Sequence, residues 1–165
     1  MNKRFNTYLA ELSPKFKFWK SPIAPWVNLA MTELGQAEIS GVKDNPRIVE
    51  YLAAAKLGGE QTGYIDEIAW CSAFVNWLMQ NTGFKSTGVG LARSWLDYGE
   101  VLDDPVVGCI VIISRGDKQW MGHVGILLDY SDDWLYILGG NQGNKVSIRA
   151  YAKNRLLGYR WPVRK

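Results

Sequence analysis

The chain has 165 residues, of which 47% are hydrophobic and 21% charged, a composition that predicts one packed globular domain and excludes a disordered chain. Its formal net charge of +3 is too small to indicate nucleic-acid binding. One histidine and two cysteines are too few for a four-ligand zinc site without carboxylates at ligand spacing, so neither a metal nor a cofactor is expected.

The N-terminal 22 residues contain lysine and arginine but lack an uninterrupted apolar core and a small-residue cleavage site. They therefore do not have the pattern of a signal peptide. No stretch of the sequence approaches the length of a membrane span. We predict two parts, an N-terminal extension of unknown role over residues 1–22 and a single domain over residues 23–165.

Four helices are predicted in the first half of the chain. The first begins at Pro25, because proline suits the first helical position, and it ends at Gly35. The second is capped by Asp44-Asn45 before Pro46 and ends at Gly58-Gly59. A short fourth helix is expected between Leu91 and Tyr98, since glycines bound it on both sides.

The third predicted helix carries a cysteine in its first turn and ends at Gly83. Cys71, Phe74 and Leu78 share one face at helical spacing. The unsatisfied N–H groups and the macrodipole at a helix N-terminus lower the pKa of a thiol from about 8.5, which favours the reactive thiolate. Taken by itself, the pattern also fits a helix that faces the core, with Cys71 as a small apolar residue on it.

After Gly99 the hydrophobic period changes from helical to extended. The connections between the extended runs are too short for the crossovers that parallel strands require. The sequence therefore predicts an α+β domain in which an antiparallel sheet of about five or six strands packs against the Cys71 helix. The β-rich runs are Val106–Ser114, His123–Tyr130, Asp133–Leu138, Lys145–Tyr151 and Leu156–Trp161.

His123 is the only histidine in the chain and opens a predicted strand between Gly122 and Gly125. These small neighbours leave room beside the imidazole for backbone or substrate. A lone strand histidine is more often structural or superficial. A thiol nucleophile needs a base, however, and this is the one imidazole available, so Cys71 and His123 form a candidate pair that the fold must bring together.

A polar pair follows the next strand, in the segment Leu138–Gln142 (Leu-Gly-Gly-Asn-Gln). Because neighbouring strands of a meander lie side by side, a polar side chain here can reach the second imidazole nitrogen and fix its tautomer. Strand alternation lets one of Asn141 and Gln142 face the ring, and the shorter, stiffer Asn141 is favoured. An ordinary hairpin turn is the alternative interpretation.

Together these segments resemble the NlpC/P60 and CHAP cysteine peptidases of the papain-like clan. The matching motifs are Ala69–Val75 (Ala-Trp-Cys-Ser-Ala-Phe-Val), Gly122–Gly125 (Gly-His-Val-Gly) and Gly139–Gln142 (Gly-Gly-Asn-Gln). A phage and bacterial subgroup shares the Trp-Cys-x-Ala-Phe-Val helix start and the Leu-Gly-Gly-Asn-Gln strand end. The similarity extends from about Pro25 to Pro162.

The resemblance implies a papain-like fold and a peptidoglycan hydrolase that cleaves an amide bond of the cell-wall peptide, as an endopeptidase or an N-acetylmuramoyl-L-alanine amidase. It implies that Cys71 is the nucleophile, His123 the base and Asn141 the orienting residue, without a cofactor or metal. The alternatives are an acyltransferase of the same clan and a non-catalytic wall-binding module whose aromatic residues stack on sugars. Substrate binding is expected of Trp70, Gly122 and Gln142.

The sequence departs from the family pattern where Pro-x-x-Gly-Asp is replaced by Pro105–Cys109, which introduces a second thiol. We interpret Cys109 as a buried strand residue. Many relatives carry secretion signals or wall-binding repeats, and this sequence shows neither. We therefore expect synthesis in the cytoplasm and delivery to the cell wall or periplasm by phage lysis or specialised secretion. The expected partners are the peptide stem and a delivery machinery or an immunity protein, but neither nucleic acid nor a membrane.

Overall fold

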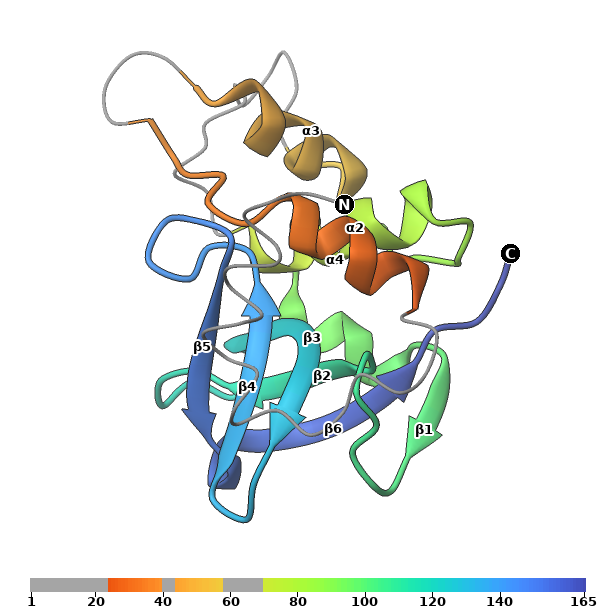
Figure 1. Ribbon diagram of the computed structural model, residues 1–165, viewed down its shortest axis with the longest axis vertical. Coiled ribbons are helices and arrows are strands. Elements are labelled where there is room, and N and C mark those ends of the chain that lie inside the picture. The colour runs from red at the N-terminus through yellow and green to blue at the C-terminus, as the bar shows by residue number, and fades with distance from the viewer. Residues whose placement is uncertain (1–23, 40–43, 58–69) are drawn as a thin grey trace.

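The computed structural model describes residues 24–39, 44–57 and 70–165, with helices in the first half and strands in the second (Figure 1). The predicted extension over residues 1–22 and the helix end at Gly58-Gly59 lie outside these residues. Within the described ranges, no helix is both long and apolar enough to cross a membrane.

The predicted helices form where their start signals lie. The Asn45 side chain accepts a hydrogen bond from the Arg47 backbone N–H at 2.9 Å, which caps the helix that begins at Pro46. Gly83 takes a φ of +81° just after the Cys71 helix, a conformation that favours glycine. The fourth segment is a 3₁₀-helix rather than an α-helix. The elements are α2 (Pro25–Thr32), α3 (Pro46–Ala54), α4 (Cys71–Asn81) and η1 (Ala92–Asp97).

The strands form one antiparallel sheet of six in the order β1-β6-β2-β3-β4-β5. This confirms the predicted α+β class and the antiparallel sheet. The sequence did not predict β1, a three-residue edge strand whose partner is the distant β6. The strands are β1 (Glu100–Leu102), β2 (Ile110–Ser114), β3 (Gly122–Tyr130), β4 (Trp134–Gly139), β5 (Ser147–Ala152) and β6 (Leu156–Trp161).

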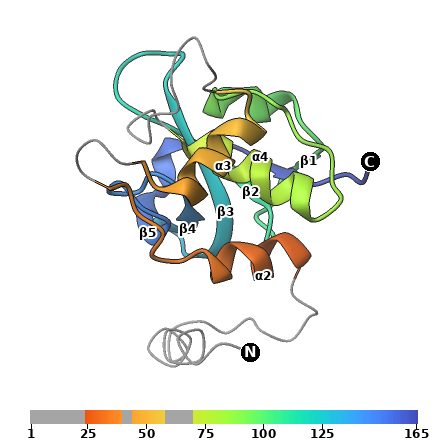
Figure 2. The ribbon, with the colours of Figure 1, turned by 90° about the horizontal axis from the view of Figure 1, so that it is seen from above.

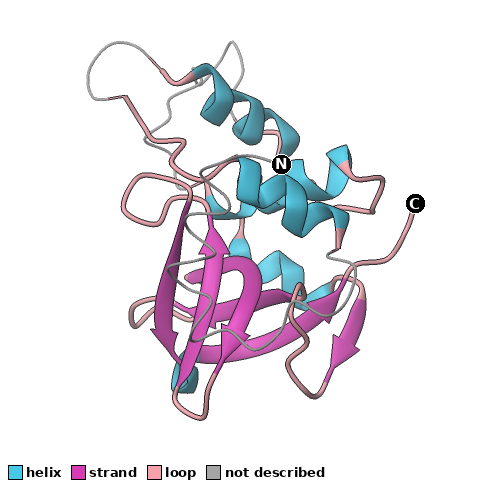
Figure 3. Ribbon diagram, viewed as in Figure 1, coloured by secondary structure: helices cyan, strands magenta, loops and turns pink. Residues whose placement is uncertain are grey.

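The sheet is curved and buries apolar side chains on both faces (Figure 3). Ile112, Val124 and Ile126 face the helices and pack in one core with α4, which crosses β3 with α2 and α3 nearby (Figure 2). Val111 and Leu127 face the opposite way and belong to a second core. Because β2 is buried on both faces, its sequence is continuously apolar instead of alternating.

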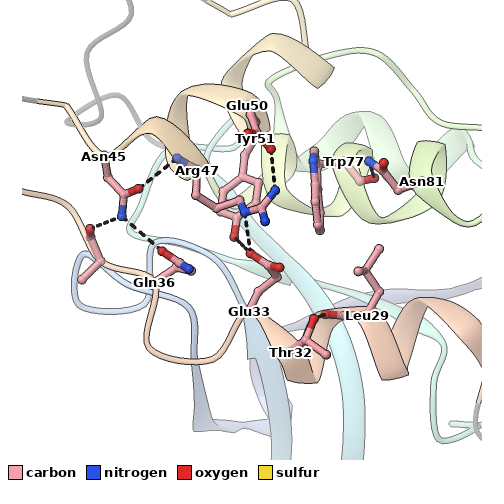
Figure 4. A network of polar contacts seen from close by, with 11 residues as sticks. Leu29, Thr32, Glu33, Gln36, Asn45, Arg47, Glu50, Tyr51, Trp77 and Asn81 are labelled. Atoms are coloured by element: carbon pink, nitrogen blue, oxygen red, sulfur yellow. Dashed lines mark hydrogen bonds and ion pairs between the residues drawn. The ribbon is translucent and has the colours of Figure 1, made fainter. Parts of the chain in front are cut away.

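A buried polar network joins the helices of the layer that carries Cys71 (Figure 4). The Glu33 carboxylate, just after α2, accepts a 2.5 Å hydrogen bond from the Tyr51 hydroxyl of α3 and lies 3.2 Å from the Arg47 guanidinium. Arg47 also pairs with Glu50 at 2.5 Å and lies over the Trp77 ring of α4. A buried carboxylate needs such partners, so the network fixes α2 and α3 against α4.

Candidate active site

Cys71 is the first residue of α4, and the residue is 5% exposed. Trp70, which precedes it, makes no side-chain hydrogen bond that caps the helix. The backbone of Val124 and of Ser72 lies close enough to the Cys71 thiol to lower its pKa. Since Val124 directly follows His123 on β3, the N-terminus of α4 meets the beginning of β3 at this thiol.

Two glycines at the end of β4 permit this meeting. A Cβ on Gly140 would lie 2.5 Å from the Trp70 ring and 2.7 Å from the Phe74 Cβ. A Cβ on Gly139 would lie 3.2 Å from the Nε2 atom of His123. The segment Gly139-Gly140 can therefore pass between the start of α4 and the imidazole only because both residues lack side chains.

The imidazole of His123 is 5% exposed and is held by Gln142, whose Oε1 lies 3.0 Å from Nε2. The Gln142 Nε2 donates to the carbonyl oxygens of Ile137 at 3.2 Å and Ser147 at 2.5 Å. Because both amide protons are used in this way, the amide oxygen faces the ring and can only accept. His123 therefore carries its proton on Nε2, and Nδ1 is left as the basic nitrogen.

Tyr151 of β5 completes this cluster, and the sequence interpretation missed it. Its hydroxyl donates to Gln142 Oε1 at 3.0 Å, and its ring centroid lies 5.4 Å from that of His123. The Arg155 guanidinium lies over the same tyrosine ring, 5.1 Å from its centroid. Alternation along β5 places Tyr151 on one face of the sheet, but no local signal indicates that this face reaches His123.

The orienting contact expected of Asn141 is made by Gln142 instead. Strand β4 ends at Gly139, so strand alternation does not govern the residues that follow. Asn141 adopts a positive φ of 55°, which turns the chain and directs the longer Gln142 side chain back to the imidazole. Among the residues described by the structure, Asn141 makes no hydrogen bond to His123.

Two of the three residues expected to bind substrate are internal supports. Trp70 is 0% exposed, and its Nε1 donates to Glu38 at 2.8 Å, so its ring is not available to a substrate. Gln142 is 2% exposed, and its amide is fully engaged. Gly122 is partly exposed beside Arg93 at the beginning of β3, and its role stays a prediction.

Burial governs the ionisation of both candidate groups. It raises the pKa of Cys71, although hydrogen bonds from Val124 and Ser72 and the charge of Arg115 lower it. Burial lowers the pKa of His123 to about 4, against the hydrogen bond to Gln142, which raises it. The expectation that the helix N-terminus lowers the thiol pKa was wrong in its net direction, since burial is the larger effect. Both shifts favour a thiol and a neutral imidazole over a thiolate–imidazolium pair.

The second thiol lies in a different environment. Cys109 immediately precedes β2 and is completely buried in the core on the far face of the sheet. Burial raises the pKa of Cys109 to about 12. This confirms that Cys109 is buried, but it lies one residue before the strand and not within it.

Iodoacetamide is expected to label Cys71 of the native protein before Cys109. Cys71 lies at the start of a helix and is slightly exposed, whereas Cys109 is enclosed by apolar side chains. Peptide mass spectrometry over a time course of labelling measures the two rates. Labelling in denaturant, where the two thiols should react at similar rates, is the control. Faster modification of Cys109 in the folded protein would contradict the assignment.

Gln142→Ala is expected to lower kcat by roughly one to three orders of magnitude, with little change in KM. The substitution removes the acceptor that holds Nε2 and leaves the imidazole free to rotate. Asn141→Ala is the matched control, since it removes an amide one residue away, and its effect should be less than about tenfold. If steady-state kinetics showed the larger loss for Asn141→Ala, the orienting residue would be Asn141 and not Gln142.

Comparison with known proteins finds a similarity to one family of domains over part of the chain. Residues 63–141 match the family model described as the CHAP domain, a segment that contains Cys71, His123 and Asn141. No curated protein matches the sequence significantly. A solved structure from Staphylococcus aureus, described as similar to a lipoprotein of the NLP/P60 family, superimposes with a TM-score of 0.47 at 15% identity. The match covers 96% of this chain and 49% of that chain, so this chain spans about half its length.

Proposed function

Because the chain carries a CHAP-like domain, we propose that it hydrolyses an amide bond in the peptide of peptidoglycan by a thiol mechanism. One observation carries the proposal. The start of α4, with Cys71, meets the start of β3, where Gln142 holds His123 in the tautomer of a base. A nucleophile, a base and an orienting acceptor are the three parts that such acyl transfer requires.

In the proposed reaction His123 takes the proton of the Cys71 thiol as the sulfur attacks the scissile carbonyl. The negative charge that develops on the carbonyl oxygen is stabilised by the Cys71 backbone N–H and by the N-terminus of α4, where N–H groups lack helical partners. The imidazolium then gives its proton to the leaving amine, and a thioester remains. Water, deprotonated by His123, attacks the thioester and releases the carboxylic acid and the free thiol.

Gln142 and Tyr151 support this cycle without entering it. When His123 becomes an imidazolium, the Gln142 oxygen continues to accept the Nε2 proton and faces a positive charge. A neutral amide does not take up the Nε2 proton, so the imidazolium gives up its Nδ1 proton, and the leaving amine receives it. The Tyr151 hydroxyl holds the same oxygen from the side at 3.0 Å, which restricts the movement of the Gln142 side chain.

The test is incubation of the protein with purified sacculi, followed by mass spectrometry of the released fragments. An endopeptidase exposes a new amino group within the stem or the cross-bridge, whereas an amidase frees the stem from the glycan. Identification of the new terminus therefore shows which bond is cleaved. Intact sacculi after prolonged incubation with several peptidoglycan types would contradict the proposed function.

Activity is expected to fall as the pH decreases through about 4, where His123 becomes protonated and no longer serves as a base. Burial raises the pKa of Cys71, so the reaction starts from the thiol and needs no imidazolium at rest. We therefore expect no loss of activity between about pH 6 and 9. The measurement is kcat/KM against pH, with circular dichroism at each pH to show that the protein is folded. An alkaline fall near neutral pH would instead indicate a thiolate–imidazolium pair.

A further inference from the structure

Three arginines from separate segments lie on the His123 side of the site. Arg115 directly follows β2, whose last residue, Ser114, pairs with Gly122 beside His123. Arg149 belongs to β5, and Arg155 to η2 (Lys153–Arg155). We refer to Arg115, Arg149 and Arg155 as the arginine rim.

Contacts fix two members of the rim beside the Gln142–Tyr151 cluster. Arg155 donates from Nε and Nη2 to the Ser114 carbonyl at 3.1 and 2.7 Å, and its guanidinium lies over the Tyr151 ring. The Arg149 guanidinium lies against Gly143, next to Gln142. Arg115 is exposed, and its charge acts on Cys71 and His123.

The rim lacks carboxylate partners in the part of the chain that the structure describes. The ion pairs found there join Arg47 to Glu33 and Glu50 in the helical layer. The charged residues that act on the imidazole of His123 are Arg115 and Arg155, both positive. The proposed reaction forms an imidazolium at this position, where the guanidinium groups oppose it. An anion that arrives with the substrate would offset this repulsion.

We propose that the arginine rim binds a carboxylate of the substrate close to the scissile amide, so that the site selects stem peptides with a free carboxylate over their amidated counterparts. Guanidinium groups recognise carboxylates by paired, charge-assisted hydrogen bonds, and a carboxamide offers no negative charge. Cell-wall peptides carry such carboxylates, and the same groups also occur as carboxamides. The inference rests on the proposed function and names the form of the peptide that the site accepts.

The test compares two synthetic stem peptides that differ in one group, a carboxylate or a carboxamide next to the scissile bond. The bond is the one that the sacculus experiment identifies. For the wild type we expect a KM about fivefold lower for the carboxylate peptide, with a difference that shrinks as salt is added. Arg115→Gln and Arg149→Gln should each reduce this preference, and the double variant should abolish it, so that the two peptides have equal KM values.

Arg164→Gln is the matched control, since it removes the same charge from a guanidinium that lies over Phe84, beyond the opposite end of α4. It should keep the full preference for the carboxylate peptide. Equal KM values of the wild type for the two peptides would contradict the carboxylate site without contradicting the proposed hydrolase function. Cleavage of neither peptide, together with intact sacculi, would overturn the proposed function and this inference with it.

Discussion

Cys71→Ala is expected to abolish the release of fragments from sacculi, with a fall of roughly three orders of magnitude or more in rate. In the proposed reaction the sulfur at the start of α4 forms the thioester, and a methyl group cannot replace it. The measurement is the appearance of soluble fragments over time for wild type and variant at equal concentration. Circular dichroism should be unchanged, since the side chain is small and the N-cap of α4 is Trp70 and not Cys71.

Cys109→Ala is the matched control, because it removes the other thiol of the chain. Cys109 lies in the core on the far face of the sheet, so we expect this variant to keep its activity. It should be less stable by roughly 1–2 kcal/mol, because a buried sulfur atom and its contacts are lost. If Cys71→Ala kept its activity and Cys109→Ala lost it, the nucleophile would be Cys109 and not Cys71.

His123→Ala is expected to reduce turnover as severely as the loss of the thiol. Without the imidazole, no group accepts the thiol proton during attack or returns it to the leaving amine. Sacculus hydrolysis measures the loss, and fluorescence or circular dichroism shows whether the fold persists. The variant should still contain a Cys71 thiol that alkylating reagents modify, which separates loss of the base from loss of the nucleophile.

Tyr151→Phe serves as the comparison within the same cluster. It removes the hydroxyl that donates to Gln142 and keeps the ring that packs beside His123. Because the base and its direct acceptor stay in place, we expect a loss of less than about tenfold, seen in kcat more than in KM. Near-normal turnover by His123→Ala would remove the assignment of the base, whatever the tyrosine variant does.

The sequence predicts those parts of the fold that depend on local signals. Proline and asparagine at helix starts locate α2 and α3, and the change of hydrophobic period after Gly99 locates the sheet. Strand β1 lacks such a signal, because three exposed or half-buried residues become a strand only through pairing with β6. Such pairing is set by the tertiary fold and not by the propensity of the segment.

In the candidate site, too, the sequence predicts some features, whereas others depend on how the chain folds and packs. The need of a thiol for a base pairs Cys71 with the single histidine, His123, and the structure brings the start of α4 to the start of β3. The choice between Asn141 and Gln142 depends on where β4 ends and on one positive φ angle, which alternation does not describe. The direction of the thiol pKa depends on burial, and burial is a property of the packed molecule.

The glycines that end β4 also determine when the newly made chain becomes chemically competent. Helix α4 forms through local contacts, whereas the neighbourhood of Cys71 and His123 exists only after Gly140 has docked on Trp70 and Phe74, far away in sequence. Contacts of this kind form late, because closure of long loops costs conformational entropy. A ribosome-bound or partly unfolded chain therefore contains the residues of the proposed site without their arrangement.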